Sequence, residues 1–181
     1  ARRRSRHRPR AGPMADHERG PVRETGTMAE GDGTEPVAVT GWAQDPNALA
    51  AFLDEPDLAR IATLDPDGSI HVVPVWYGWD GTDFLVGADA TSTKVMNVRR
   101  TGRASLAIDG DLRRKRGILV RGSATLIDGA DGRRRYLALT EAQVRRYQPD
   151  RPPHETASRM AARGEPVVIA IRPRSIVSWG R

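Results

Sequence analysis

Hydrophobic and polar residues alternate along much of the chain after residue 45, and this period of two predicts β-strands. A short helix is expected before the first of them. Asp45 is a favourable N-cap, Pro46 suits the first helical position, and Leu49, Phe52 and Leu53 share one face. Ordered structure is therefore predicted to begin near Asp45.

Three strands are predicted next, over residues 58–64, 69–79 and 82–88. The connections between them contain Asp-Pro-Asp-Gly and Asp-Gly, which are typical of tight turns. Because the connections are short, we expect the three strands to form an antiparallel meander.

The rest of the chain mixes helical and strand patterns. The elements expected here are a helix through Arg100, strands over 104–109 and 117–127, helices over 131–147 and 155–163, and a last strand over 167–179 that is interrupted by Pro173. Consecutive hairpins with few crossovers predict an antiparallel barrel, in a mainly β (α+β) fold, and not a doubly wound parallel sheet.

The first 41 residues contain much Arg, Gly, Pro, Glu and Thr and few large apolar side chains. Such a segment cannot bury enough apolar surface to offset the entropy lost on ordering. We expect a disordered basic tail over 1–41 and one folded domain over 42–181. Met14 and Met28 lie in the tail, and either is a candidate initiator.

The net charge of +6 comes from the tail. Residues 1–10 carry six arginines, and without them 23 basic residues balance 23 acidic ones. The charge therefore predicts non-specific nucleic-acid binding by the tail at most. The absence of cysteine excludes disulfides and thiolate sites and suits a cytoplasmic protein. Only two of the 29 basic residues are lysines, a bias typical of GC-rich actinobacterial genomes.

The segment Thr91-Ser92-Thr93-Lys94 opens a predicted helix. Hydroxyl groups, free backbone N–H groups and the positive end of the helix dipole together make an anion site. A cation such as Lys94 is unfavourable in the first turn unless an anion binds there. The pattern indicates a phosphate site, and a capped surface helix with a solvated lysine is the alternative.

The strand over 72–77 reads Val-Val-Pro-Val-Trp-Tyr, with even-numbered residues on one face and odd-numbered residues on the other. Pro74 cannot donate to a sheet ladder, so it belongs at an edge, at a bulge or beside a ligand. A flat ring could lie against this backbone. A barrel edge with aromatic core residues is the alternative.

These two segments carry a resemblance. V-x-P-V-W at 72–76 and S-x-K-x-x-N-x-R-R at 92–100 stand in an order and spacing that resembles the pyridoxamine 5′-phosphate oxidase-like split β-barrel superfamily. The resemblance covers residues 46–179 and is nearest to the flavin/deazaflavin oxidoreductases of actinobacteria. It implies an antiparallel split β-barrel with short flanking helices, and a homodimer with a cofactor at each side of its interface.

The resemblance also implies the site residues. The cofactor phosphate and ribityl chain would be held by Ser92, Thr93, Lys94 and Asn97, and the ring would be lined by Val73, Pro74, Val75 and Trp76. Trp179 would complete the site from the second chain, or else be a plain core residue. Arg116, in the basic loop 113–116, is a candidate for holding the anionic tail of a deazaflavin, and a solvated charged loop is the alternative.

The implied function is hydride transfer between F420H2, the reduced deazaflavin coenzyme F420, and a small organic acceptor. FMN is the alternative cofactor, because its phosphate would use the same residues. No catalytic acid or base and no metal site stand out, and the sequence contains no dinucleotide, P-loop, metalloprotease or hydrolase motif. A non-catalytic cofactor, haem or tetrapyrrole binder is the rival, with His71 as its one strand histidine.

Overall fold

The structure, a computed structural model, describes residues 36–110 and 115–180. Of the tail expected over residues 1–41, residues 1–35 lie outside the described residues. Order begins earlier than predicted, because strand β1 (Ala38–Thr40) and a 3-10 helix, η1 (Gly41–Gln44), precede Asp45. β1 is held by main-chain pairing, with Ala38 opposite Ser175, and such pairing needs no hydrophobic pattern.

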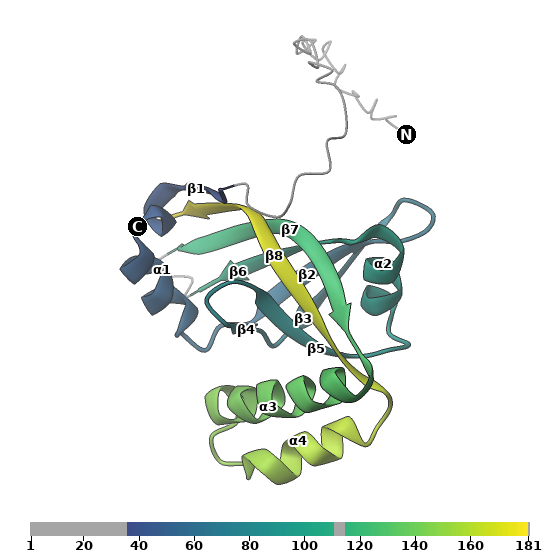
Figure 1. Cartoon of the computed structure of the whole chain (residues 1–181). Helices are drawn as coiled ribbons and strands as arrows, with labels where there is room; N and C mark the ends of the chain where they lie inside the picture. The colour runs from purple at the N-terminus through teal and green to yellow at the C-terminus, as the bar shows by residue number, and fades with distance from the viewer. Residues whose placement is uncertain (1–35, 111–114, 181) are drawn as a thin grey trace, which may run out of the picture. The chain divides into compact units, whose positions relative to one another are not determined.

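The remaining elements agree with the predicted order (Figure 1). In chain order they are α1 (Pro46–Leu53), β2 (Ala59–Leu64), β3 (Ile70–Val75), β4 (Gly78–Trp79), β5 (Phe84–Asp89), α2 (Thr93–Thr101), β6 (Arg103–Asp109), β7 (Gly117–Ile127), α3 (Gly129–Tyr147), α4 (Pro153–Ala161) and β8 (Pro166–Trp179). The Asp45 carboxylate caps α1 by accepting from the Asn47 N–H at 2.9 Å, as the sequence predicted.

The strands form one sheet in the order β3-β2-β6-β7-β8-β5-β4, antiparallel throughout, with β1 added in parallel to β8. The antiparallel split barrel with short flanking helices is confirmed. The predicted meander is wrong, because β3 pairs with β2 whereas β4 pairs with β5. The strand expected over 69–79 breaks at Trp76 and Tyr77, and its two halves lie at opposite ends of the sheet.

The last strand runs through Pro173 without the predicted interruption. The register between β7 and β8 shifts between Arg121 and Gly122, and Gly122 lies opposite Pro173. A Cβ at Gly122 would overlap the carbonyl oxygen of Arg172, so glycine is needed for this close approach. The irregularity absorbs a proline that would otherwise end the ladder.

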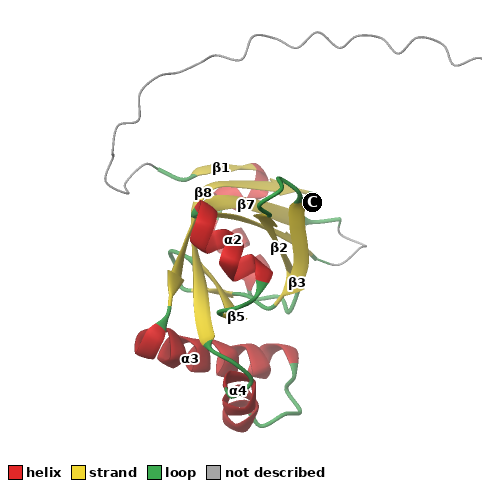
Figure 2. Ribbon diagram, turned by 90° about the vertical axis from the view of Figure 1, so that its right-hand side faces the viewer, coloured by secondary structure: helices red, strands yellow, loops and turns green. Residues whose placement is uncertain are grey.

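The barrel interior is filled by apolar side chains from the strands, together with Phe52 and Leu53 of α1 and Val95 and Val98 of α2. A second, smaller cluster joins α3 and α4 to Val168 of β8. Figure 2 shows α2 lying across the strands, with α3 and α4 together beyond their ends. The site described below lies where this helical pair meets β3, β5 and α2.

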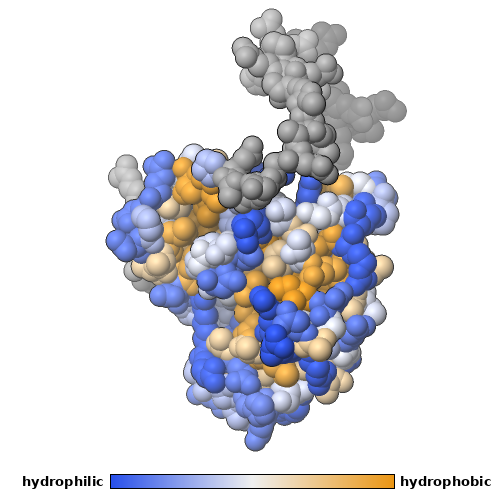
Figure 3. Space-filling model, viewed as in Figure 1, coloured by the Kyte–Doolittle hydropathy of each residue, from blue (hydrophilic) through white to orange (hydrophobic). Residues whose placement is uncertain are grey.

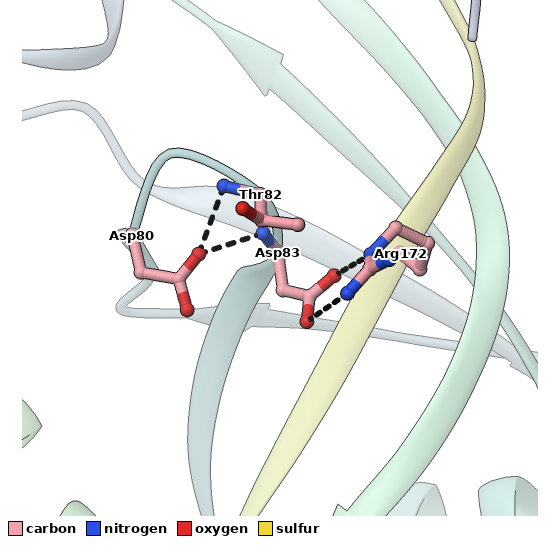
Figure 4. A network of polar contacts seen from close by, with 4 residues as sticks. All are labelled: Asp80, Thr82, Asp83 and Arg172. Atoms are coloured by element: carbon pink, nitrogen blue, oxygen red, sulfur yellow. Dashed lines mark hydrogen bonds and ion pairs between the residues drawn. The ribbon is translucent and has the colours of Figure 1, made fainter. Parts of the chain in front are cut away.

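A polar network fixes β5 against β8 (Figure 4). The Asp80 carboxylate accepts from the N–H groups of Thr82 and Asp83, at 2.9 and 2.8 Å, and so shapes the turn before β5. The Arg172 guanidinium of β8 donates to both carboxylate oxygens of Asp83. This two-point contact holds the pKa of Arg172 above its usual value.

On the face seen in Figure 3, apolar side chains gather over the barrel strands and near β1, while α3 and α4 present mostly polar side chains. Within residues 36–110 and 115–180, every helix is too short or too polar to cross a membrane.

Candidate functional site

A pocket of about 220 Å³ lies between the barrel and the helical pair α3–α4. The residues that line it are Pro74, Val75, Trp76, Gly87, Lys94, Tyr136, Thr140, Gln143 and Met160. Four of the predicted site residues, Pro74, Val75, Trp76 and Lys94, therefore line one pocket. The first three lie in and directly after β3, whereas Lys94 lies in α2. A larger cavity of about 440 Å³, lined by β2, β6 and the β7–β8 irregularity, contains none of them.

Lys94 is half-buried in the first turn of α2. Burial lowers the pKa of its ammonium group below the usual value, and the nearby Asp89 carboxylate opposes this shift. Asp89 is itself engaged, because it accepts from the Thr91 N–H at 2.9 Å and from the Glu165 N–H at 3.0 Å. Among the described residues, no carboxylate lies within ion-pair distance of Lys94.

The start of α2 keeps donors free. Ser92 is the N-cap residue by backbone conformation, but its hydroxyl donates back to the carbonyl oxygen of Asp89 at 2.7 Å and does not cap the helix. The N–H groups of Val95 and Met96 reach the Ser92 carbonyl. Those of Thr93 and Lys94 precede the helical hydrogen-bond ladder, as at any helix start.

Asn97 and Val73 do not reach the pocket. Asn97 is 2% exposed, and its amide nitrogen donates to the Thr63 hydroxyl at 3.1 Å and to the Asp65 carboxylate at 2.7 Å. Asn97 thus ties α2 to β2 and its turn, and the contact with the cofactor phosphate and ribityl chain that the resemblance implies stays a prediction. Val73 packs against the barrel core.

Trp76 is held by the end of α3. Its ring stacks on that of Tyr147, with centroids 5.3 Å apart and planes 12° from parallel. The Tyr147 hydroxyl donates to the Asp57 carbonyl at 2.9 Å. The stacked position of Trp76 therefore depends on α3 being seated against the segment that follows α1.

Burial raises the pKa of Tyr147 from 10.0 to about 12. Since the pKa of Tyr147 is higher in the folded state than in the unfolded state, its protonated hydroxyl group stabilises the fold. This stabilisation is complete below pH 10 and is lost as the pH rises toward 12. Tyr147→Phe cannot ionise and also lacks the hydrogen bond. We expect the difference in Tm between the wild type and this variant to narrow over that interval. A difference that stays constant across it would contradict the prediction.

The α3 wall of the pocket was missed by the sequence reasoning. Tyr136 lies directly on β5, since a Cβ at Gly87 would be 3.1 Å from its ring. Leu139 approaches β4 in the same way, with 2.7 Å to a Cβ at Gly78. Single glycines inside two adjacent strands were the available signal, because they indicate that another element comes close to the backbone.

Arg116 and Trp179 lie elsewhere in the chain. The Arg116 guanidinium stands 3.8 Å from the centroid of the Trp42 ring, whose indole N–H donates to the Trp179 carbonyl at 2.9 Å. Val168 of β8 pairs with Gly87 in the pocket, and Trp179 lies eleven residues farther along that strand, which is roughly 35 Å of extended chain. One chain does not bring these two residues to Lys94.

The antiparallel split barrel, with a pocket beneath a helical pair, defines the class of protein. The family described as pyridoxamine 5′-phosphate oxidase matches residues 46–180, and the chain belongs to this family. No curated protein matches the chain.

Solved structures repeat the fold. A conserved hypothetical protein from Mycobacterium tuberculosis is 24% identical, with a TM-score of 0.63 over 81% of this chain and 88% of its own. An F420 reductase is 24% identical, with a TM-score of 0.54 over 70% and 93%. A haem storage protein from Vibrio cholerae is 12% identical, with a TM-score of 0.56 over 71% and 89%. At these identities the likeness shows the fold alone.

Proposed function

We propose that the protein is an F420H2-dependent oxidoreductase, which transfers a hydride between the deazaflavin coenzyme F420 and a small organic acceptor. The observation that carries the proposal is the pocket in which the half-buried Lys94 faces the strand segment 74–76. A cytoplasmic location and a homodimeric assembly belong to the same proposal.

The start of α2 offers the positive charge and the hydrogen-bond donors that a phosphate group would bind. Burying an ammonium group is costly unless an anion compensates it, and the described residues place no carboxylate in an ion pair with Lys94. The free N–H groups of the first turn and the helix dipole add to the attraction. Lys94 and Thr93 would therefore hold the phosphate end of the cofactor, and Ser92 would join them by exchanging the hydrogen bond of its hydroxyl to the Asp89 carbonyl for one to the phosphate.

The segment 74–76 fits one side of a flat ring. Pro74 presents its own ring and no N–H to the pocket, Trp76 adds an aromatic ring, and the space over Gly87 is filled by the Tyr136 ring. A bound deazaflavin supplies the hydride chemistry. The chain binds the cofactor at both ends, orients its ring against the strand, and excludes water on the side that α3 covers.

The size of the pocket supports a homodimer. Ligand pockets commonly enclose about 300–1,000 Å³, and this one is about 220 Å³, so a second surface has to complete it for a whole coenzyme. The outward face of β3 offers such a contact surface, with Ile70 63% and Val72 54% exposed. In a homodimer, Trp179 and Arg116 would serve the pocket of the partner chain.

The test is a fluorescence titration of the protein with coenzyme F420 and, separately, with FMN. We expect Lys94→Ala to weaken binding tenfold or more, about 1.4 kcal/mol, because the phosphate loses its charged donor. Arg99→Ala removes an exposed cation from the same helix, away from the pocket, and should leave the affinity nearly unchanged.

The outcomes separate the candidate functions. Binding of FMN alone would keep the site and make the protein an FMN-dependent oxidoreductase. Oxidation of F420H2 that begins only when an acceptor is added distinguishes an enzyme from a protein that merely stores a cofactor or tetrapyrrole. If the wild type and Lys94→Ala bind the cofactor with equal affinity, the assignment of the phosphate site to Lys94 is wrong.

A further inference from the structure

The side-chain amide of Gln143 is the unexplained polar group of the pocket. Gln143 lies on α3 and is 5% exposed, and its Nε2 atom is buried without a hydrogen-bond partner among residues 36–110 and 115–180. Buried amide groups in native proteins are nearly always hydrogen-bonded, because an unpaired donor loses its hydration and gains nothing. A donor kept in this state and lining a pocket indicates an acceptor that arrives from outside the chain.

The chemistry around Gln143 limits what that acceptor can be. Its neighbours on the same wall, Tyr136 and Thr140, are buried hydroxyl residues, and burial raises the pKa of Tyr136, which keeps it neutral. Of the described residues that line the pocket, Lys94 is the one cation, and it comes from α2 and not from this helix. An anionic group would favour a cation beside it, whereas a neutral amide donor suits an uncharged carbonyl oxygen.

The pocket admits a group of limited size. A volume of about 220 Å³ equals the share of roughly seven water molecules in the liquid. This volume has room for one end of a flat ring system that enters between segment 74–76 and α3. Segment 74–76 offers backbone and the Trp76 ring to the face of such a group, and Gln143 offers a donor from the helix opposite.

We propose that Gln143 is a positioning residue that donates, through Nε2, to a ring carbonyl oxygen of the bound heterocycle and so fixes the ring against segment 74–76. The inference rests on the proposed function. The cofactor would thus be held by two independent contacts, one between its phosphate and Lys94 and one between the carbonyl edge of its ring and Gln143.

The experiment compares Gln143→Met with the wild type by fluorescence titration, with coenzyme F420, FMN and riboflavin as probes. Riboflavin carries the ring without a phosphate. We expect Gln143→Met to weaken all three tenfold or more, and Lys94→Ala to weaken F420 and FMN while leaving riboflavin nearly unchanged. Gln148→Met makes the same chemical change at the C-cap residue that follows this helix, outside the pocket, and serves as the control.

The unliganded protein provides a second readout. Gln143→Met preserves volume and removes the unpaired donor, so its Tm without ligand should equal or exceed that of the wild type. Gln143→Asn keeps the amide but shortens its reach, and it should also bind the ring more weakly. A purely structural role would instead lower the Tm of Gln143→Met.

The two levels of the proposal fail differently. If Gln143→Met binds all three probes as the wild type does, or if Gln148→Met loses as much affinity, the role of Gln143 is overturned while the proposed function stands. If the wild type binds neither F420 nor FMN, the proposed function is overturned and this inference with it.

Discussion

Arg146→Ala is expected to lower the free energy of unfolding by about 3 kcal/mol. The guanidinium of Arg146 donates from α3 to the carbonyl oxygens of Leu53 and Glu55 and, at 3.3 Å, to the Tyr77 hydroxyl. It also lies against the rings of Tyr77 and Tyr147, at 5.0 and 5.2 Å from their centroids. Removing it breaks several hydrogen bonds to a charged donor and leaves their acceptors half-buried.

Thermal or denaturant unfolding measures this loss, and a fall in Tm of about 10 °C is expected for a domain of this size. Arg145→Ala is the matched control. Arg145 is exposed and, within the described part of the chain, pairs with Glu141 alone, at 3.5 Å, so its loss should cost about 0.5 kcal/mol or less. Similar losses for the two variants would show that Arg146 does not join α3 to the segment after α1.

Asn97→Ala is expected to lower the free energy of unfolding by about 2 kcal/mol. The buried amide satisfies both the Thr63 hydroxyl and the Asp65 carboxylate, and alanine leaves the two acceptors without their donor. The affinity for cofactor should change much less than in Lys94→Ala, because Asn97 lies outside the pocket.

Chemical denaturation and the cofactor titration, carried out on the same preparation, check both parts of this prediction. Met96→Ala, at the exposed neighbouring position of α2, is the control and should be nearly neutral in both. A loss of affinity as large as that of Lys94→Ala, without loss of stability, would restore Asn97 as a cofactor ligand.

Elements with local signals could be predicted from the sequence. The cap at Asp45 and Pro46 set the start of α1, and the bounds predicted for β7 are those observed. Elements set by distant partners could not. β1 depends on its pairing with β8, and the separation of β3 from β4 depends on which neighbour each half finds in the sheet.

The residues of the site likewise fall into those that local sequence signals predict and those that depend on distant contacts. Pro74 and Lys94 are unusual for their local positions, in a strand and in a first helical turn, and the structure brings both to one pocket. Gln143 and Thr140 are ordinary polar residues in a helix, and only the packing of α3 on Gly78 and Gly87 turns them inward. Asn97 shows the converse, because its motif position suggested a ligand while its buried amide is hydrogen-bonded to Thr63 and Asp65, and a role toward the cofactor stays a prediction.

The position of β8 determines when the barrel can close during synthesis. Its fourteen residues pair with β5 on one edge and β7 on the other, and β1 joins them near the end. A ribosome adds about 5–20 residues per second, so β1 waits on the order of ten seconds for its partner. Until then β3, β2, β6 and β7 can form only an open sheet with β7 at its edge. A nascent chain that stalls before β8 would present that edge to other chains, and association with them would compete with completion of the fold.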